Sequence, residues 1–216
     1  MLNYVEYGKE NKYDDDIFFQ KYSQMSRSQQ GLAGAGEWET LRKLLPDFKD
    51  KRVLDLGCGY GWHCIYAMEH GASSVVGVDI SHKMLEVAKE KTHFPQVEYK
   101  CCAIEDVEFP EESFDVILSS LAFHYVADYE ILVKKIYRIL KSGGKLVFTV
   151  EHPVFTAYGT QDWHYNEKGE ILHFPVDNYY YEGKRTAVFL GEKVTKYHRT
   201  LTTYLNTLLS NGFIIN

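Results

Sequence analysis

The sequence predicts an α/β fold built on a doubly wound, mostly parallel sheet. Three observations support this prediction. Short apolar runs rich in β-branched residues alternate with amphipathic segments from residue 51 onward. A glycine-rich turn follows the first of these runs. The strands lack the apolar–polar alternation of half-exposed strands, as expected where helices cover both faces of a parallel sheet.

Each element has its own signal in the sequence. Strand-like runs are predicted at Arg52–Leu56, Val75–Val78, Val97–Cys102, Phe114–Ser119 and Lys145–Val150. Helices are predicted at about Gly36–Leu45, at Trp62–His70, after Ser81 as N-cap, and from Asp128 to the Gly143–Gly144 pair. The short acidic segment 103–113 is predicted to be a loop. Strand–helix alternation implies right-handed crossovers within one sheet.

The flanking segments follow a different rhythm. We expect one domain over residues 1–216: an N-terminal helical cap (1–50), a core (51–151), an aromatic lid or insertion (152–199), and a C-terminal helix with the start of the last strands (200–216). Within the insertion, Val176–Tyr181 and Thr186–Leu190 are predicted to form an antiparallel pair. A helix is expected at Arg199–Leu209, followed by a strand beginning at Gly212.

Composition excludes several functions. The formal charge is -6, and no run of Lys or Arg exceeds two residues, which disfavours a nucleic-acid-binding protein. No apolar stretch approaches the roughly 20 residues that cross a bilayer, and the N-terminus has no secretory pattern. The four cysteines form no zinc-type pairs, and the nine histidines show no metal-binding spacing, so we expect free thiols in the cytoplasm and no metal.

The most informative stretch is DLGCGYG at residues 55–61. A strand running into a glycine-rich turn that opens a helix lets the backbone approach a ligand closely. About twenty residues later the second strand ends at Asp79, where a carboxylate can accept hydrogen bonds from ribose hydroxyls. Together these features predict a nucleoside-containing cofactor.

Asp55 narrows the choice of cofactor. It comes two residues before Gly57, and we expect it at the mouth of the glycine turn. A carboxylate there repels the pyrophosphate of a dinucleotide and attracts the cationic sulfonium and ammonium of S-adenosylmethionine. The alternative is that Asp55 only orders the glycine turn.

With these motifs in order, the chain resembles the class I S-adenosylmethionine-dependent methyltransferases, in particular the small type 11 domain. The resemblance covers most of residues 50–151. It rests on four stretches: DLGCGYG, VVGVDIS, AIEDVEFPEESFDVILSSLAFHYV and LKSGGKLVFTVE. It implies a Rossmann-like fold, S-adenosylmethionine as cofactor and methyl transfer by in-line displacement.

The resemblance also implies roles for individual residues. Glycines of the turn line the methionine part, Asp79 and the next residue bind ribose and adenine, the 104–105 pair flanks adenine, and the end of the fourth strand lies beside methionine. The resulting candidate cofactor-binding residues are Asp55, Gly57, Cys58, Gly59, Asp79, Ile80, Ile104, Glu105 and Ser119, with Arg27 for the carboxylate. Many relatives carry Asp where this chain has Ala103, so Glu105 or Asp106 would substitute.

The methyl acceptor is predicted to be a small molecule. The chain reads Ser119-Ser120-Leu121-Ala122 where methyltransferases of nucleobases and amides carry an Asn/Asp-Pro-Pro-aromatic tetrapeptide. His124 and His152 follow the fourth and fifth strands and are the candidate catalytic residues, with ordering of the rim as the alternative. His63 is a weaker candidate for ligand contact.

Aromatic side chains in the cap and insertion suit a flat or apolar acceptor, although core packing explains each of them equally well. They are Tyr22, Trp38, Trp163, Tyr179, Tyr180 and Tyr181. Arg199 is a candidate for binding an anionic acceptor. Two alternatives to a methyltransferase are an NAD-linked oxidoreductase and a cofactor-binding sensor or scaffold without turnover.

Overall fold

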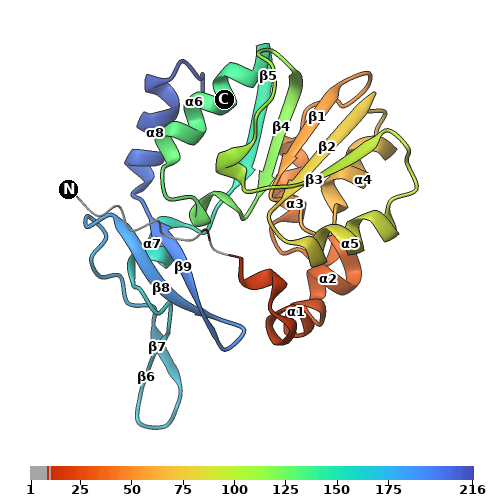
Figure 1. Ribbon diagram of the computed structural model, residues 1–216. Coiled ribbons are helices and arrows are strands. Elements are labelled where there is room, and N and C mark those ends of the chain that lie inside the picture. Colours follow the sequence, from red (N-terminus) through yellow and green to blue (C-terminus); the bar gives the residue numbers. More distant parts are fainter. Residues whose placement is uncertain (1–8, 10) are drawn as a thin grey trace, which may run out of the picture.

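The computed structural model describes residue 9 and residues 11–216. Its centre is a five-stranded, all-parallel sheet in the order β3-β2-β1-β4-β5 (Figure 1). The strands are β1 (Arg52–Leu56), β2 (Ser74–Asp79), β3 (Val97–Cys101), β4 (Phe114–Ser120) and β5 (Leu140–Thr149). The doubly wound parallel sheet predicted from the alternating pattern is therefore confirmed.

Helices cover both faces of this sheet. They are α3 (Trp38–Leu44), α4 (Trp62–Glu69), α5 (His82–Lys91), α6 (Tyr129–Ile139) and α8 (Leu201–Ser210). Successive strand residues point to opposite faces. Leu54 and Leu56 thus join the core under α6 and α8, whereas Val53 joins the core under α4 and α5. Figure 1 shows the two helical layers on either side of the sheet.

The predicted N-cap at Ser81 is present, and Asp128, predicted as the start of a helix, caps that helix. The Ser81 hydroxyl accepts a hydrogen bond from the backbone of Met84, and the Asp128 carboxylate accepts one from Ile131. The predicted end of the helix that begins after Asp128 was wrong. The helix stops at Ile139, and β5 already begins at Leu140, with the glycine pair inside an irregular part of the strand.

The N-terminal segment forms the predicted helical cap. Besides α3 it contains α1 (Asp16–Ser23), α2 (Ser26–Gln30) and the 3-10 turns η1 (Lys12–Asp14) and η2 (Gly31–Gly34). Two further 3-10 turns, η3 (Ile104–Asp106) and η4 (Phe123–Tyr125), lie in the loops after β3 and β4. In Figure 1, α1 and α2 lie beyond the carboxyl end of the sheet, on the same side as the loops that follow β1 and β2.

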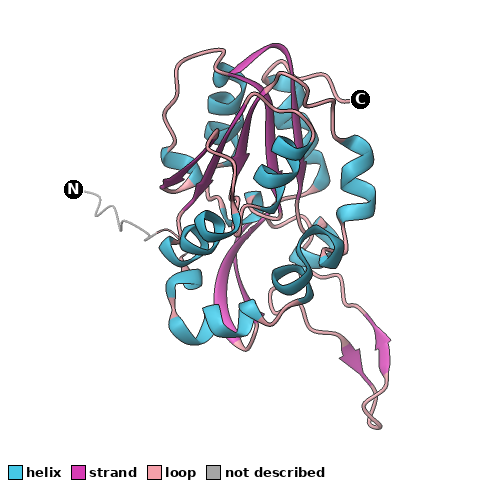
Figure 2. Ribbon diagram, turned by 90° about the vertical axis from the view of Figure 1, so that its right-hand side faces the viewer, coloured by secondary structure: helices cyan, strands magenta, loops and turns pink. Residues whose placement is uncertain are grey.

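The insertion after β5 contains α7 (Pro153–Ala157) and two hairpins. The first pairs β6 (His164–Tyr165) with β7 (Ile171–His173) and projects from the body of the molecule (Figure 2). The second pairs β8 (Gly183–Phe189) with β9 (Glu192–His198). The predicted pairing of Val176–Tyr181 with Thr186–Leu190 was wrong. The turn is instead made by Leu190 and Gly191, whose positive φ angles of 54° and 80° suit a two-residue hairpin.

The predicted strand at the C-terminus was also wrong. Gly212, at φ +90°, follows the last turn of α8, and the residues after it form no strand. The ring of Phe213 packs against Tyr137 of α6 instead. Among the described helices, none combines the length and apolar character needed to cross a bilayer.

Candidate active site

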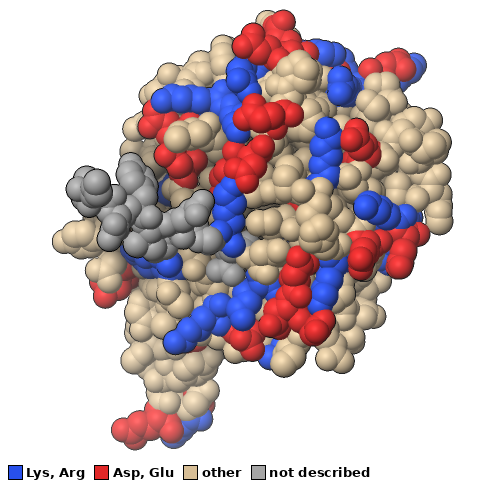
Figure 3. Space-filling model, in the orientation of Figure 1, with Lys and Arg blue, Asp and Glu red and all other residues tan. Residues whose placement is uncertain are grey.

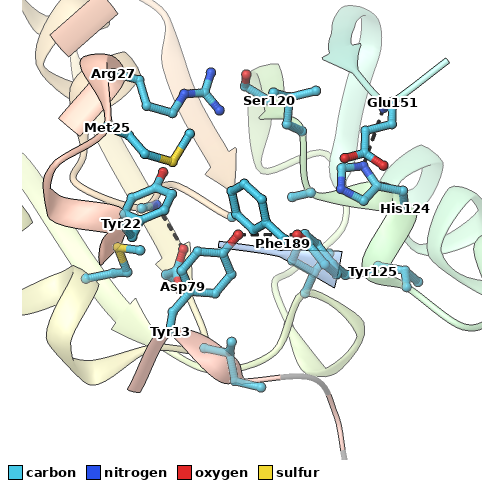
Figure 4. Close-up of a pocket in the computed structure, with 18 of the residues that line it drawn as sticks. Tyr13, Tyr22, Met25, Arg27, Asp79, Ser120, His124, Tyr125, Glu151 and Phe189 are labelled. Carbon is cyan, nitrogen blue, oxygen red and sulfur yellow. Dashed lines mark hydrogen bonds between the residues drawn. The ribbon is translucent and has the colours of Figure 1, made fainter. Parts of the chain in front are cut away.

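A cavity of about 400 Å³ opens at the carboxyl ends of the parallel strands. Loops after all five strands form its floor, and the N-terminal cap and β8 complete its walls. Open α/β sheets bind ligands at this edge. Figure 4 shows the residues discussed below around this space.

The glycine loop, residues 57–61, forms one wall. Gly57, Gly59 and Gly61 all have positive φ angles, of 77°, 52° and 75°. The backbone N–H of Gly57 donates to the carbonyl of Val78, 2.8 Å away, which fixes the loop to β2. A Cβ at Gly57 would lie 2.5 Å from that of Ala122, whereas one at Gly59 would project into open space of the cavity. The space beside Gly59 is therefore available to a ligand.

Asp79 occupies the end of β2 as predicted and lines the cavity. Its carboxylate accepts hydrogen bonds from the backbone N–H of Gly59, at 2.8 Å, and of Ser81, at 2.9 Å. Burial raises the pKa of Asp79 against the lowering effect of these two bonds. The carboxylate is thus held rigidly beside the glycine loop, in the place expected for a ribose partner.

Three further candidates line the same side of the cavity: Ile80, Ile104 and Glu105. Ala103 lies beside them and brings no polar group. Asp106, the other predicted substitute for the missing acid, forms an ion pair with Lys9 and is not part of the wall. Of the two predicted substitutes, Glu105 is therefore the one placed at the cavity.

Asp55 is not where the sequence argument required it. Its side chain is 1% exposed, lies beneath the glycine loop facing α4, and accepts a hydrogen bond from the Cys64 thiol. It does not line the cavity. The reason is strand alternation, because Asp55 shares the face of Val53 rather than the carboxyl edge. Burial raises its pKa to about 7, so the expected full negative charge at the mouth of the turn is absent from this residue.

Ser119 and Cys58 also differ from expectation. Ser119 is buried, and its hydroxyl donates to the carbonyl of Leu56 at 2.7 Å. The next residue, Ser120, lines the cavity in its place. The Cys58 thiol is buried, and this residue lines a smaller neighbouring cavity of about 70 Å³ together with His63. Burial lowers the pKa of His63 to about 4.

Glu37 is a cavity residue that sequence reasoning missed. It lies just before α3, lines the cavity, forms an ion pair with Arg27, and accepts a hydrogen bond from the Ser120 hydroxyl at 3.0 Å. The ion pair and hydrogen bonds lower the pKa of Glu37 although burial opposes this. The predicted candidate Arg27 also lines the cavity. An acid before a helix is common, so no signal in the sequence marked Glu37.

The opposite end of the cavity holds a polar cluster, which we name the end wall: His124, Glu151, Gln161 and Lys196. His124 and Glu151 line the cavity directly. The Lys196 ammonium lies 2.5 Å from Glu151 Oε1, and the Gln161 amide donates to Glu151 Oε2 at 2.8 Å. Burial lowers the pKa of His124 to about 4, so this histidine is neutral at pH 7.

His152, the second catalytic candidate, does not line the cavity. Its Nδ1 atom accepts a hydrogen bond from the backbone of Val154 and so caps α7. Arg199 is also directed elsewhere, since its guanidinium donates to the carbonyls of Val126 and Ala127. Both residues order the rim rather than face a ligand.

The aromatic walls come from a different set of residues than predicted. Tyr22 lines the cavity as expected, joined by Tyr13, Tyr125 and Phe189. The other predicted aromatic residues do not line it: Trp38, Trp163, Tyr179, Tyr180 and Tyr181. The sequence predicted that aromatic rings would line the cavity, but which rings line it depends on the tertiary structure.

Comparisons with known proteins agree with this arrangement. A family model described as a methyltransferase domain matches residues 54–148. A crystal structure of a candidate S-adenosylmethionine-dependent methyltransferase from Listeria monocytogenes is 58% identical, with a TM-score of 0.81 over 84% of this chain and 85% of that one. An S-adenosylmethionine-dependent methyltransferase from Mesorhizobium loti is 41% identical, with a TM-score of 0.80 over 86% and 84% of the two chains.

A curated relative is more distant. The ubiquinone biosynthesis O-methyltransferase of Coxiella burnetii is 36% identical over 51% of this chain and 47% of its own length. The chain therefore aligns with about half of that enzyme.

The fold, the glycine loop and the placed Asp79 define a nucleoside-binding α/β protein of the methyltransferase class. The chain belongs to the family of S-adenosylmethionine-dependent methyltransferases. It is an enzyme with S-adenosylmethionine as its cofactor, and the comparisons support neither the nicotinamide-dependent nor the sensor alternative.

Proposed function

We propose that the enzyme methylates a small molecule enclosed in the cavity between the N-terminal cap and the β8–β9 hairpin. The observation that carries this proposal is a contact across the opening. The ring of Phe18 in α1 lies 5.7 Å from that of Phe189 in β8, and the Lys21 ammonium donates to the carbonyl of Leu190. Cap and hairpin thus meet beside the cavity, which Phe189 also lines, and this enclosure suits a small acceptor better than a polymer.

The residues present fit S-adenosylmethionine. Asp79 would hold the ribose hydroxyls, and Ile80 and Ile104 would contact the adenine, with Glu105 near its edge. Gly57 and Gly59 would let the methionine part approach the backbone. Glu37 takes over the role that the sequence argument gave to Asp55, as the carboxylate available to the ammonium, and Arg27 would face the cofactor carboxylate.

The bound cofactor supplies an electrophilic methyl group on a good leaving group. The protein therefore needs mainly to align the acceptor and keep water out. Tyr13, Tyr22, Tyr125 and Phe189 suit both tasks, since their rings narrow the middle of the cavity (Figure 4). His124 reaches the acceptor side of this space, and His152 has no place in the mechanism.

Two further observations favour a small acceptor. The relative from Coxiella burnetii is named for a step in ubiquinone biosynthesis, which concerns a small molecule. On the face drawn in Figure 3, Lys and Arg side chains are interspersed with Asp and Glu rather than gathered into a basic patch. A protein that binds nucleic acid needs clustered cations. Since all four cysteines are free, we also propose a reducing, cytoplasmic setting.

Tritium-labelled S-adenosylmethionine tests the proposal. The enzyme is incubated with the labelled cofactor and a whole bacterial extract, and macromolecules are then removed by ultrafiltration. We expect enzyme-dependent label in the filtrate, in a compound other than the cofactor and its breakdown products. Label retained with protein or RNA would contradict the proposal, as would the lack of any enzyme-dependent product.

A further inference from the structure

The end wall leaves no free carboxylate for an acceptor. Both oxygens of Glu151 are engaged, one by the Lys196 ammonium and the other by the Gln161 amide. The Lys196 side chain is 3% exposed, so this ion pair is largely shielded from solvent. Lys196 and Gln161, which belong to the insertion after β5, therefore neutralise Glu151. An acceptor that carries an ammonium group would find no unpaired carboxylate in the end wall.

The contacts of His124 suit a hydrogen-bond donor better than a base. Its Nδ1 atom accepts a hydrogen bond from the backbone N–H of Glu151, 3.5 Å away. An N–H donor opposite Nδ1 requires the neutral tautomer with its hydrogen on Nε2. Figure 4 shows the ring edge that carries Nε2 turned toward the cavity. His124 thus presents a hydrogen-bond donor to the acceptor.

Charges around the ring support the neutral form. Glu151 favours protonation of His124, but burial, Lys196 and Arg199 oppose it, and the pKa falls to about 4. Tyr13 offers no alternative base. Burial raises its pKa well above the ordinary value, and its hydroxyl is within 3.3 Å of the Tyr125 hydroxyl. The polar groups at this end are therefore a donor and a neutralised ion pair.

We propose that the methyl acceptor is a carboxylate carried on an apolar or aromatic body, and that the product is its methyl ester. This inference rests on the proposed function. One carboxylate oxygen accepts the Nε2–H of His124, and the other attacks the methyl carbon. The new C–O bond forms as the C–S bond breaks, the electron pair stays on sulfur, and no proton moves.

Other nucleophiles fit this wall less well. A phenol or alcohol must lose a proton, and the end wall holds no base to receive it. A phenolate has only one oxygen, so the hydrogen bond from His124 would engage the same atom that must attack the methyl group. An amine arrives as an ammonium and needs both a base and a free carboxylate. A carboxyl group ionises with a pKa of about 4 and comes to the site already reactive.

The chemistry of the labelled product tests the acceptor class without knowing its identity. The labelled filtrate from the previous experiment is treated with mild alkali, which hydrolyses methyl esters and releases volatile labelled methanol. We expect most of the enzyme-dependent label to become volatile. Label that survives alkali would overturn the carboxylate while leaving the proposed function intact. Absence of enzyme-dependent label would contradict the proposed function, and this inference with it.

A second measurement examines His124 in the free enzyme. Long-range ¹H–¹⁵N spectra of histidine-labelled protein distinguish the two neutral tautomers and the imidazolium. We expect the Nε2–H tautomer at pH 7, assigned by its loss in His124→Gln. The other tautomer or the charged ring would overturn the inference.

Variants at this position separate a donor from a base. His124→Gln keeps an amide N–H near Nε2 and is expected to retain at least a tenth of kcat/KM, without an acidic limb between pH 6 and 9. His124→Leu is expected to lose at least a hundredfold. Equal loss in both variants, with cofactor affinity unchanged, would contradict a donor role.

Discussion

The Lys196 ammonium and the Glu151 carboxylate lie 2.5 Å apart and join the end of the insertion to the segment after β5. Lys196 and Gln161 are 35 positions apart in the sequence, yet both bind Glu151. The pair fixes the end wall of the cavity. It therefore links the stability of the insertion to the shape of the acceptor site.

Lys196→Met is expected to destabilise the protein by about 2–4 kcal/mol, because it leaves Glu151 partly buried without its cation. The pKa of Glu151 is lowered in the fold, because the neighbouring His124 ring, the Lys196 ammonium and the hydrogen bonds from Lys196 and Gln161 together outweigh burial. This contribution is therefore complete above the ordinary value of 4.5 and is lost as the pH falls through the lower folded pKa. Urea unfolding at several pH values measures it.

Lys193→Met is the control, since Lys193 is exposed on the same strand. We expect the gap between the two variants to be widest near pH 7 and to narrow in acid below pH 4.5. Equal stabilities of the two variants at pH 7 would show that the Lys196–Glu151 pair makes no net contribution.

Asp79→Asn is expected to weaken binding of S-adenosylhomocysteine at least tenfold by calorimetry. The amide can accept only one of the two backbone hydrogen bonds that now hold the carboxylate, and it binds ribose hydroxyls less strongly. Because burial raises the pKa of Asp79, the wild-type affinity should also fall in mild acid as this group is protonated. Glu98→Gln, at an exposed position of β3, is the control. Unchanged affinity in Asp79→Asn would mean that the ribose site is misplaced.

The core of the site could be predicted because its signals are local. A strand, a glycine loop and an acid at the end of the next strand each leave a mark within a few residues, and Gly57, Gly59 and Asp79 lie as expected. The spacing of Asp55 from the turn does not determine which way its side chain points. Strand alternation, which was available in the sequence, assigns it to the face covered by α4.

The remaining walls depend on contacts distant in sequence. Phe189 reaches the cavity only because β8 pairs with β9 through the turn at Leu190–Gly191. Glu37 lines the cavity, and Lys196, 159 positions later in the chain, binds Glu151 at the other end of it. No periodicity within either segment records such a meeting, so the acceptor end had to be seen in the structure.

Asp55→Asn tests whether the buried Asp55 side chain is protonated in the folded protein. The raised pKa, about 7 against an ordinary 3.8, means that the folded protein holds a proton that the unfolded chain has released between those values. Wild-type stability should then fall as the pH rises through this window, by at most about 4 kcal/mol at roughly 1.4 kcal/mol per unit. Asn mimics the protonated acid and should remove that slope.

The comparison is made by chemical denaturation at pH 4.5 and pH 8. The exposed Glu111→Gln variant serves as a control for loss of one charge. We expect Asp55→Asn to gain stability relative to wild type at the higher pH, and the control to change little. Parallel pH profiles for wild type and Asp55→Asn would show that Asp55 is ionised in the fold.

Gly57→Ala tests the glycine loop against a matched position. Both Gly57 and Gly143 have φ angles near +75°, so an alanine at either meets similar backbone strain of about 1 kcal/mol or more. Only at Gly57 does the added Cβ collide with another residue, 2.5 Å from the Cβ of Ala122, whereas at Gly143 it meets open space. Gly57→Ala should therefore lose cofactor affinity at least tenfold and more stability than Gly143→Ala, which should bind normally. If both variants lost stability equally and bound S-adenosylhomocysteine like wild type, the contact between the loop and Ala122 would not shape the site.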